Sequence, residues 1–182
     1  MKKAFFLLFL ACFVACSALA YGSPYEEIWF DFESTTWPNS FHAVESAGIQ
    51  ICVPDPLAPM ELNEANIAHG IVAMFMTEAG ECMYVSLQGY VDANGAPLAS
   101  LPLYQQYLLD TNPYIAASEI YLLNGVPALI YTDTDLDEKC VSLLHASLPG
   151  TVVTVTFSHA ASHPEFMEMT AETIPSIMPL AE

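Results

Sequence analysis

The stretch from Glu119 to Ser158 constrains the fold most, because it predicts an antiparallel series of strands joined by tight turns. Asn124 and Gly125 lie between two apolar runs, and both residues tolerate the positive φ that a type I′ hairpin turn requires. Residues 151–158 alternate apolar and hydroxyl side chains, which indicates a strand with two different faces. The flanking strands are apolar on both faces near their centres, so we expect a sheet that is covered on both sides.

The two-residue turn also predicts the register of its hairpin. Leu123 should pair with Val126, and Leu122 should face Pro127 as a non-hydrogen-bonded pair. Pro127 has no N–H to donate. A non-hydrogen-bonded pair needs no such N–H, so the pairing of Pro127 with Leu122 is unaffected. We therefore expect a gap, a bulge or an open edge on the other side of the strand that contains Pro127.

The segments before this stretch predict further strands, at residues 48–53, 70–77 and 82–91. Two amphipathic segments predict helices that cover the sheet. Runs of antiparallel strands with two such helices are typical of a layered α+β domain. We therefore predict an antiparallel β-sheet of about six strands flanked by two amphipathic helices.

The two helices are expected at residues 101–109 and near the end of the chain. Ser162 and Glu165 have the S-x-x-E spacing of a capping box, which predicts the start of the second helix. We expect this helix to run to about Met178. Pro175 lacks the N–H that would bond four residues back, so it should kink the last turn.

The first 20 residues predict export. Residues 1–20 have the basic start, short apolar run and small terminal residues of a signal peptide, with cleavage expected after Ala20. An alternative reading is a lipobox that ends at Cys16, which would then be the lipidated first residue. No later segment is apolar for long enough to span a bilayer. We expect the protein in the cell envelope or the extracellular space.

Beyond the signal peptide, the sequence divides into an N-terminal strap over residues 21–45 and a single α+β domain over residues 46–182. The strap interleaves aromatic and acidic side chains. We expect the aromatic rings to pack onto the edge of the domain, since such side chains are usually buried. The alternative is an aromatic platform on which sugars stack.

The charge balance excludes several classes of partner. After residue 20, Lys139 stands against 21 acidic residues, and the chain contains no arginine. Nucleic acids and anionic lipid surfaces would be repelled, and a cationic clamp for phosphate or carboxylate is missing. Neutral ligands, cations and basic protein surfaces remain. The simplest explanation of the charge is solubility outside the cell.

Three cysteines follow the signal peptide, namely Cys52, Cys82 and Cys140. Their spacing does not match a zinc motif, and each lies in a predicted strand. An odd number allows one disulfide and one buried thiol, or three buried thiols.

The order of these elements resembles the PsbP-like group, which includes the nuclear transport factor Mog and exported bacterial relatives. The resemblance rests on the proline-terminated GIQICVP strand, the central NG hairpin, the VTVTF strand and the closing helix with SI near its end. It covers about residues 48–180. It implies an α/β/α sandwich and a binding or accessory role without shared catalytic residues. The aromatic strap departs from the group.

Two clusters of polar residues could hold a metal ion. Asp133, Asp135 and Asp137 begin like a calcium loop, but the glycine and the bidentate glutamate of that loop are missing. A solvated acidic turn explains the cluster more simply. His159 and His163, with the nearby Glu165, could collect zinc, although a polar strand-to-helix loop is the simpler reading.

No nucleophile elbow, P-loop or dinucleotide-binding glycine pattern is present in the sequence. We therefore expect a non-catalytic binding or accessory protein whose partner is an unknown protein or a neutral ligand, with no cofactor. The alternative is a carboxylate-based hydrolase that acts on a neutral glycan. Paired carboxylates on a concave surface beside Trp29 or Trp37 would favour the hydrolase. A flat, apolar sheet edge near Pro127 would favour the binding protein.

Overall fold

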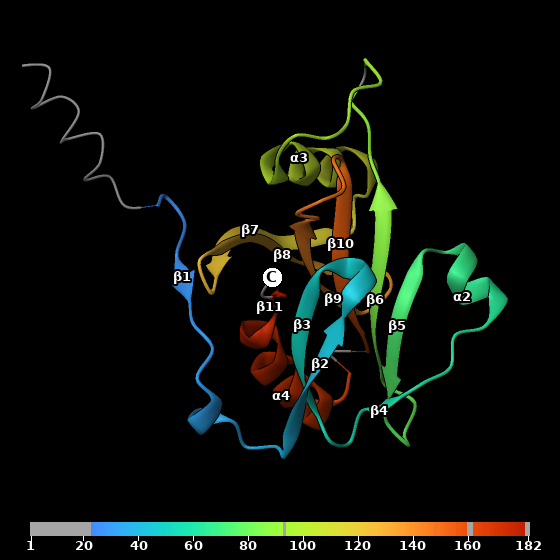
Figure 1. Cartoon of the computed structure of the whole chain (residues 1–182), viewed down its shortest axis with the longest axis vertical. Coiled ribbons are helices and arrows are strands. Elements are labelled where there is room, and N and C mark those ends of the chain that lie inside the picture. The colour runs from blue at the N-terminus through green and yellow to red at the C-terminus, as the bar shows by residue number, and fades with distance from the viewer. Residues whose placement is uncertain (1–22, 93, 160–161, 181–182) are drawn as a thin grey trace, which may run out of the picture.

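The computed structural model describes residues 23–92, 94–159 and 162–180 (Figure 1). The predicted signal peptide over residues 1–20 and the alternative lipidation site Cys16 lie outside the described residues. Within the described ranges, none of the helices is both long and apolar enough to cross a membrane.

The larger of two sheets has eight strands in the order β1-β7-β8-β9-β10-β6-β5-β4. All neighbours are antiparallel except β1 and β7, which are parallel. In spatial order the strands are β1 (Glu27–Ile28), β7 (Ile115–Leu123), β8 (Val126–Asp133), β9 (Glu138–Leu144), β10 (Thr151–Ser158), β6 (Cys82–Gly89), β5 (Ile71–Met76) and β4 (Ala58–Pro59).

A second, three-stranded sheet consists of β2 (Asn39–Val44), β3 (Ile49–Pro54) and β11 (Met178–Pro179), with β3 in the middle. The helices are α2 (Glu64–Ala68), α3 (Leu101–Thr111) and α4 (Pro164–Thr173), with three short 3-10 turns, η1 (Phe32–Ser34), η2 (Glu45–Ala47) and η3 (Ile174–Ser176). Figure 1 shows α4 beside β3, and α3 well away from both. The helix α3 packs on β7 and β8.

Alternation along β10 determines which core each of its side chains joins. Val153, Val155 and Phe157 belong to the larger core, which fills the space between the large sheet, β3 and α4. Val152 points to the opposite face and joins a smaller core beneath α3. The prediction of a sheet covered on both faces is confirmed for its central strands.

The predicted hairpin is confirmed. Asn124 and Gly125 have φ values of 49° and 82°, and Leu122 pairs with Pro127. On the other side of β8, pairing with β9 begins only at Leu129, although β9 continues past the partner of that residue. Pro127 therefore lies beside a gap in the ladder, as its missing N–H predicts.

The α+β class is confirmed, but the prediction of a single sheet of about six strands was wrong. The predicted first strand is β3, which leaves the large sheet and forms the centre of the second one. The strands β1, β4 and β11 have two residues each, too few to show a period of two in the sequence. The strand β2, with the sequence NSFHAV, lies within the strap and does not alternate apolar and polar residues strictly.

The capping box predicted for the last helix was also wrong. The N-cap of α4 is His163, without a side-chain capping bond, and the helix begins at Pro164. Proline suits the first helical position, because its missing N–H has no partner there in any case. The Ser162 hydroxyl donates to Asp137 instead. The α-helix ends at Thr173, and Pro175 lies in the 3-10 turn η3, so the predicted run to Met178 was too long.

Gly70 begins the hairpin of β5 and β6 and provides a test of this packing. Its φ is +76°, and a Cβ there would lie 2.4 Å from the Leu87 carbonyl oxygen. Gly80 has a φ of +98°, but a Cβ there would meet nothing within 4 Å. Both glycine-to-alanine changes introduce backbone strain, but only Gly70→Ala adds a clash. We expect Gly70→Ala to lower the free energy of unfolding by about 1–3 kcal/mol more than Gly80→Ala, as measured by urea denaturation. Equal losses in the two variants would contradict the close approach.

Candidate functional site

An acid-lined pocket opens where the first turns of α4 meet the turn that joins β5 to β6. Its volume is about 460 Å³. Four carboxylates line it, namely Asp55, Glu78, Glu81 and Glu165. The remaining lining is largely apolar and includes Trp37, Met76, Phe166 and Met169. We call this cavity the Trp37 pocket. It combines negative charge with apolar walls and an aromatic ring.

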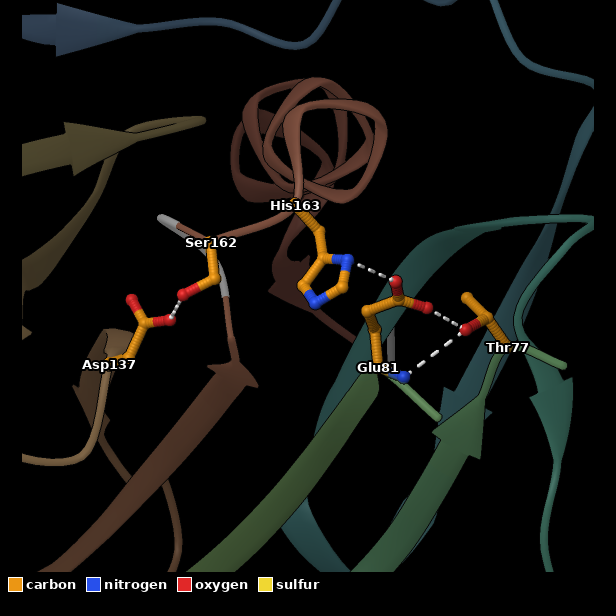
Figure 2. Close-up of polar contacts among 5 residues, drawn as sticks. All are labelled: Thr77, Glu81, Asp137, Ser162 and His163. Carbon is orange, nitrogen blue, oxygen red and sulfur yellow. Dashed lines mark hydrogen bonds and ion pairs between the residues drawn. The ribbon is translucent and has the colours of Figure 1, made fainter. Parts of the chain in front are cut away.

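Glu81 is the buried carboxylate of this pocket, with 8% of its surface exposed. Its Oε2 accepts a hydrogen bond from the Thr77 hydroxyl, and its Oε1 lies 3.1 Å from Nδ1 of His163 (Figure 2). The Glu81 backbone N–H donates to the Thr77 hydroxyl at 3.2 Å, which closes the turn. The Thr77 hydrogen bond is the main reason that the pKa of Glu81 is lowered, and the neighbouring His163 and His159 add to the effect. Glu81 is therefore held as a carboxylate.

His159 and His163 lie near each other between β10 and α4. His163 pairs with Glu81 across the pocket wall, and the ring of His159 lies 6.4 Å from that of His163. The described part of the chain contains no group of three or more His, Cys, Asp or Glu side chains positioned to hold a metal. Zinc binding by His159, His163 and Glu165 stays a prediction.

The Glu81–His163 pair does not form part of a hydrolytic triad with the adjacent serine. In such triads a carboxylate orients an imidazole, which in turn activates a hydroxyl. Figure 2 shows that the Ser162 hydroxyl turns toward Asp137 and away from the imidazole of His163. The pair therefore serves to join the start of α4 to the turn between β5 and β6.

Trp37 is held in place by α4. The carboxylate of Glu172 accepts hydrogen bonds from the backbone N–H groups of Thr36, at 2.9 Å, and Trp37, at 3.3 Å. The half-buried indole packs against the larger core. Its Nε1 is buried and has no hydrogen-bond partner among the residues that the structure describes. Glu172 thus determines where the aromatic wall of the pocket lies.

The other aromatic residues of the strap behave differently from Trp37. Trp29 is 63% exposed, and its indole N–H donates to Glu27. Phe30, Phe32 and Phe41 contact one another with ring centroids 5.8–6.3 Å apart, and Phe32 and Phe41 remain exposed. The expectation that the strap buries its rings on the edge of the domain thus describes Trp37 but not Trp29, Phe32 or Phe41.

The aspartates of the suggested calcium loop bond to the protein itself. Asp133 accepts hydrogen bonds from the N–H groups of Asp135 and Leu136, and also from the Asn112 amide at 2.7 Å. Asp137 accepts from Ser162. Two of the three carboxylates are thus used to shape the loop from β8 to β9 and to link it to the segment before α4. Calcium binding by Asp133, Asp135 and Asp137 stays a prediction.

The three cysteines are free thiols. Cys52 and Cys140 are buried, and Cys82 is half-buried. Burial raises the pKa of all three, for Cys140 to about 12. A raised pKa disfavours the thiolate, so these residues are poor nucleophiles and poor metal ligands at neutral pH.

Sequence reasoning missed both residues that shape the Trp37 pocket. Glu172 follows Glu165 and Glu168 at helical spacing, which predicts one wet face for all three. The strap folds back over Glu172, and nothing in the local pattern indicates that contact. Glu81 follows glycine in a short polar turn, where an exposed side chain is the usual outcome.

Replacing Glu172 by alanine tests the anchor of the strap. Glu172→Ala leaves the N–H groups of Thr36 and Trp37 without their acceptor, so the free energy of unfolding should fall by about 1–2 kcal/mol. Glu168→Ala, an exposed position on the same helix, should change it by less than about 0.5 kcal/mol. Urea denaturation followed by tryptophan fluorescence measures both. Equal effects in the two variants would show that Glu172 does not hold the strap.

The lowered pKa of Glu81 predicts a specific pH dependence of stability. Because the folded-state pKa lies below the ordinary glutamate value of about 4.3, the carboxylate stabilises the fold above that value. The contribution disappears as the pH falls through the lower, folded-state pKa. The difference in unfolding free energy between the wild type and Glu81→Gln should therefore be present at neutral pH and vanish in acid. Thr77→Val removes the main cause of the shift and should move this loss to higher pH. A difference that is independent of pH would contradict the assignment.

Comparisons with known proteins identify the fold. No family model matches the sequence, and no curated protein matches it. Among solved structures, the chain is similar to the solution structure of cyanobacterial PsbP (CyanoP) from Synechocystis sp. PCC 6803. The TM-score is 0.53 at 11% sequence identity, over 81% of this chain and 95% of that chain. The protein therefore has a PsbP-like α+β fold.

Proposed function

We propose that the protein is an exported, acidic, non-catalytic binding protein that holds a cationic side chain of a basic partner protein in the Trp37 pocket. The observation that carries this proposal is the pocket itself, whose lining combines four carboxylates with apolar side chains and a tryptophan ring. Export rests on the signal-peptide pattern of residues 1–20.

The chemistry of the pocket suits a lysine-like group better than a neutral or anionic one. Asp55, Glu78 and Glu165 are exposed at the pocket, where their charges attract a cation and repel anions. Met76, Phe166 and Met169 offer apolar surface to the alkyl stem of a lysine or arginine side chain. The ring of Trp37 in the lining offers a face for a cation–π contact, which is strongest for tryptophan.

A carboxylate-based hydrolase is the second candidate, because carboxylates do lie on a concave surface beside Trp37. β8 lies between β7 and β9, and near Pro127 its side toward β9 is left unpaired over a short stretch. A glycosidase also needs a general acid whose pKa is raised. The buried acid of this pocket, Glu81, has a lowered pKa and is hydrogen-bonded to Thr77. Glu138, whose pKa burial raises, lines a different hollow. These observations favour binding over hydrolysis.

The binding proposal can be tested with butylammonium, which has the same end group as a lysine side chain, and with n-butanol as its neutral counterpart. The indole N–H resonances in a ¹H–¹⁵N spectrum distinguish the two tryptophans, and Trp29→Phe assigns them. We expect butylammonium to shift the Trp37 signal and to leave the exposed Trp29 signal in place. The double variant Glu78→Gln, Glu165→Gln should weaken binding roughly tenfold, because two attracting charges are lost.

Glu168→Gln removes one charge from an exposed face of α4 outside the pocket lining and serves as the control. Equal shifts with butanol, or no weakening in the double variant, would exclude a cation site. Release of a chromophore from neutral aryl glycosides that depends on Glu165 would establish the hydrolase instead.

A further inference from the structure

A second, polar hollow lies on the face of the large sheet that α3 only partly covers. The β-ladder registers align side chains in rows across the strands on this face. One row runs Tyr84, Thr156, Cys140 and Tyr131 over β6, β10, β9 and β8. The apolar part of the face joins the core beneath α3, and the polar part is left as a cavity of about 210 Å³.

The cavity is lined mainly by hydroxyl and amide groups. Tyr84, Ser86 and Gln88 come from alternate positions of β6, and Thr154 and Thr156 face them from β10. On the side of α3, the Tyr104 hydroxyl lies 3.4 Å from that of Tyr90, and Tyr90 donates to Gln88 at 2.8 Å. Tyr104 and Thr156 are almost fully buried, with exposed fractions of 2% and 3%. These polar groups line one common space.

The two carboxylates in the lining are already engaged by protein donors. Glu138 accepts from the Tyr84 hydroxyl at 3.1 Å and from Ser158 at 3.2 Å. Asp133 accepts from the Asn112 amide and from two backbone N–H groups. Their negative charge disfavours an anionic ligand, and their bonds to neutral donors make them poor sites for a cation. Burial raises the pKa of Tyr84, so its hydroxyl stays a neutral donor.

We propose that this hollow binds one ring of a neutral sugar or a similar polyol. A polyol offers several hydroxyls that both donate and accept, which matches the mixture of tyrosine, threonine, serine and amide groups on the walls. The rings of Tyr84 and Tyr90, which belong to the lining, offer apolar surface to C–H groups of the sugar ring. This site lies on the opposite face of the sheet from the larger core and is independent of the function proposed for the Trp37 pocket.

Methyl β-glucoside and N-acetylglucosamine are suitable neutral probes, with glucuronate and glucosamine as anionic and cationic counterparts. Binding is followed by ¹H–¹⁵N shifts of the backbone amides of β6 and β10. We expect at least one neutral probe to shift Ser86 and Thr154, and glucuronate to shift neither. Thr154→Val and Tyr84→Phe remove single hydroxyls with little change in shape, and each should weaken binding about tenfold.

Tyr25→Phe removes a hydroxyl from the strap, outside the lining of the hollow, and should leave the affinity unchanged. Because valine and phenylalanine preserve volume, urea denaturation of the variants separates a lost contact from a lost fold. Binding of glucosamine without either neutral probe would make the hollow a cation site and overturn the proposal. It would also be overturned if no neutral probe shifted these amides, or if the shifts were the same in Thr154→Val.

Discussion

The alternation of side chains across β8, β9 and β10 is the constraint on which the rest of the structure depends. Because β9 pairs with β10 and with β8 from Leu129 onward without a register shift, each paired residue is assigned to one face of the sheet. Val153, Val155 and Phe157 are committed to the larger core, and Thr154 and Thr156 to the opposite face. A slip of one residue would exchange the two sets and would place hydroxyls in the apolar core.

This constraint explains why both concave sites lie where they do. One face of the sheet is apolar and must be covered, and β3 with α4 supply that cover. The Trp37 pocket forms at the margin of this layer, where the start of α4 stands above the turn between β5 and β6. The other face is apolar in part, so α3 covers that part and leaves a polar hollow beside it.

The distribution of charge follows from the same arrangement. The acidic residues are mostly exposed at the surface. Glu81 and Glu172, which shape the Trp37 pocket, are less exposed. Each carboxylate is stabilised mainly by neutral hydrogen-bond donors and not by a charged partner. Buried or half-buried carboxylates of this kind require such donors, because a bare charge is costly to remove from water. Tertiary contacts between distant segments provide them.

The strands of the central meander, the hairpin register around Asn124, the gap beside Pro127 and the positions of α3 and α4 could be predicted from the sequence. Each of these follows from local chemistry, namely turn propensity, the missing N–H of proline, or the period of apolar residues. The sequence alone also predicts that anionic partners are repelled, since this prediction rests on composition and needs no coordinates.

Only the tertiary structure decided that β3 leaves the large sheet, that two-residue strands close its edges and that α4 begins at Pro164. It alone brought Glu81 to His163 and the strap to Glu172, over separations of about 80 and 135 residues. The physical reason is that long-range contacts depend on how layers stack, and the energy of stacking is spread over many residues. A single glutamate has the same local pattern whether a distant segment folds over it or leaves it in water.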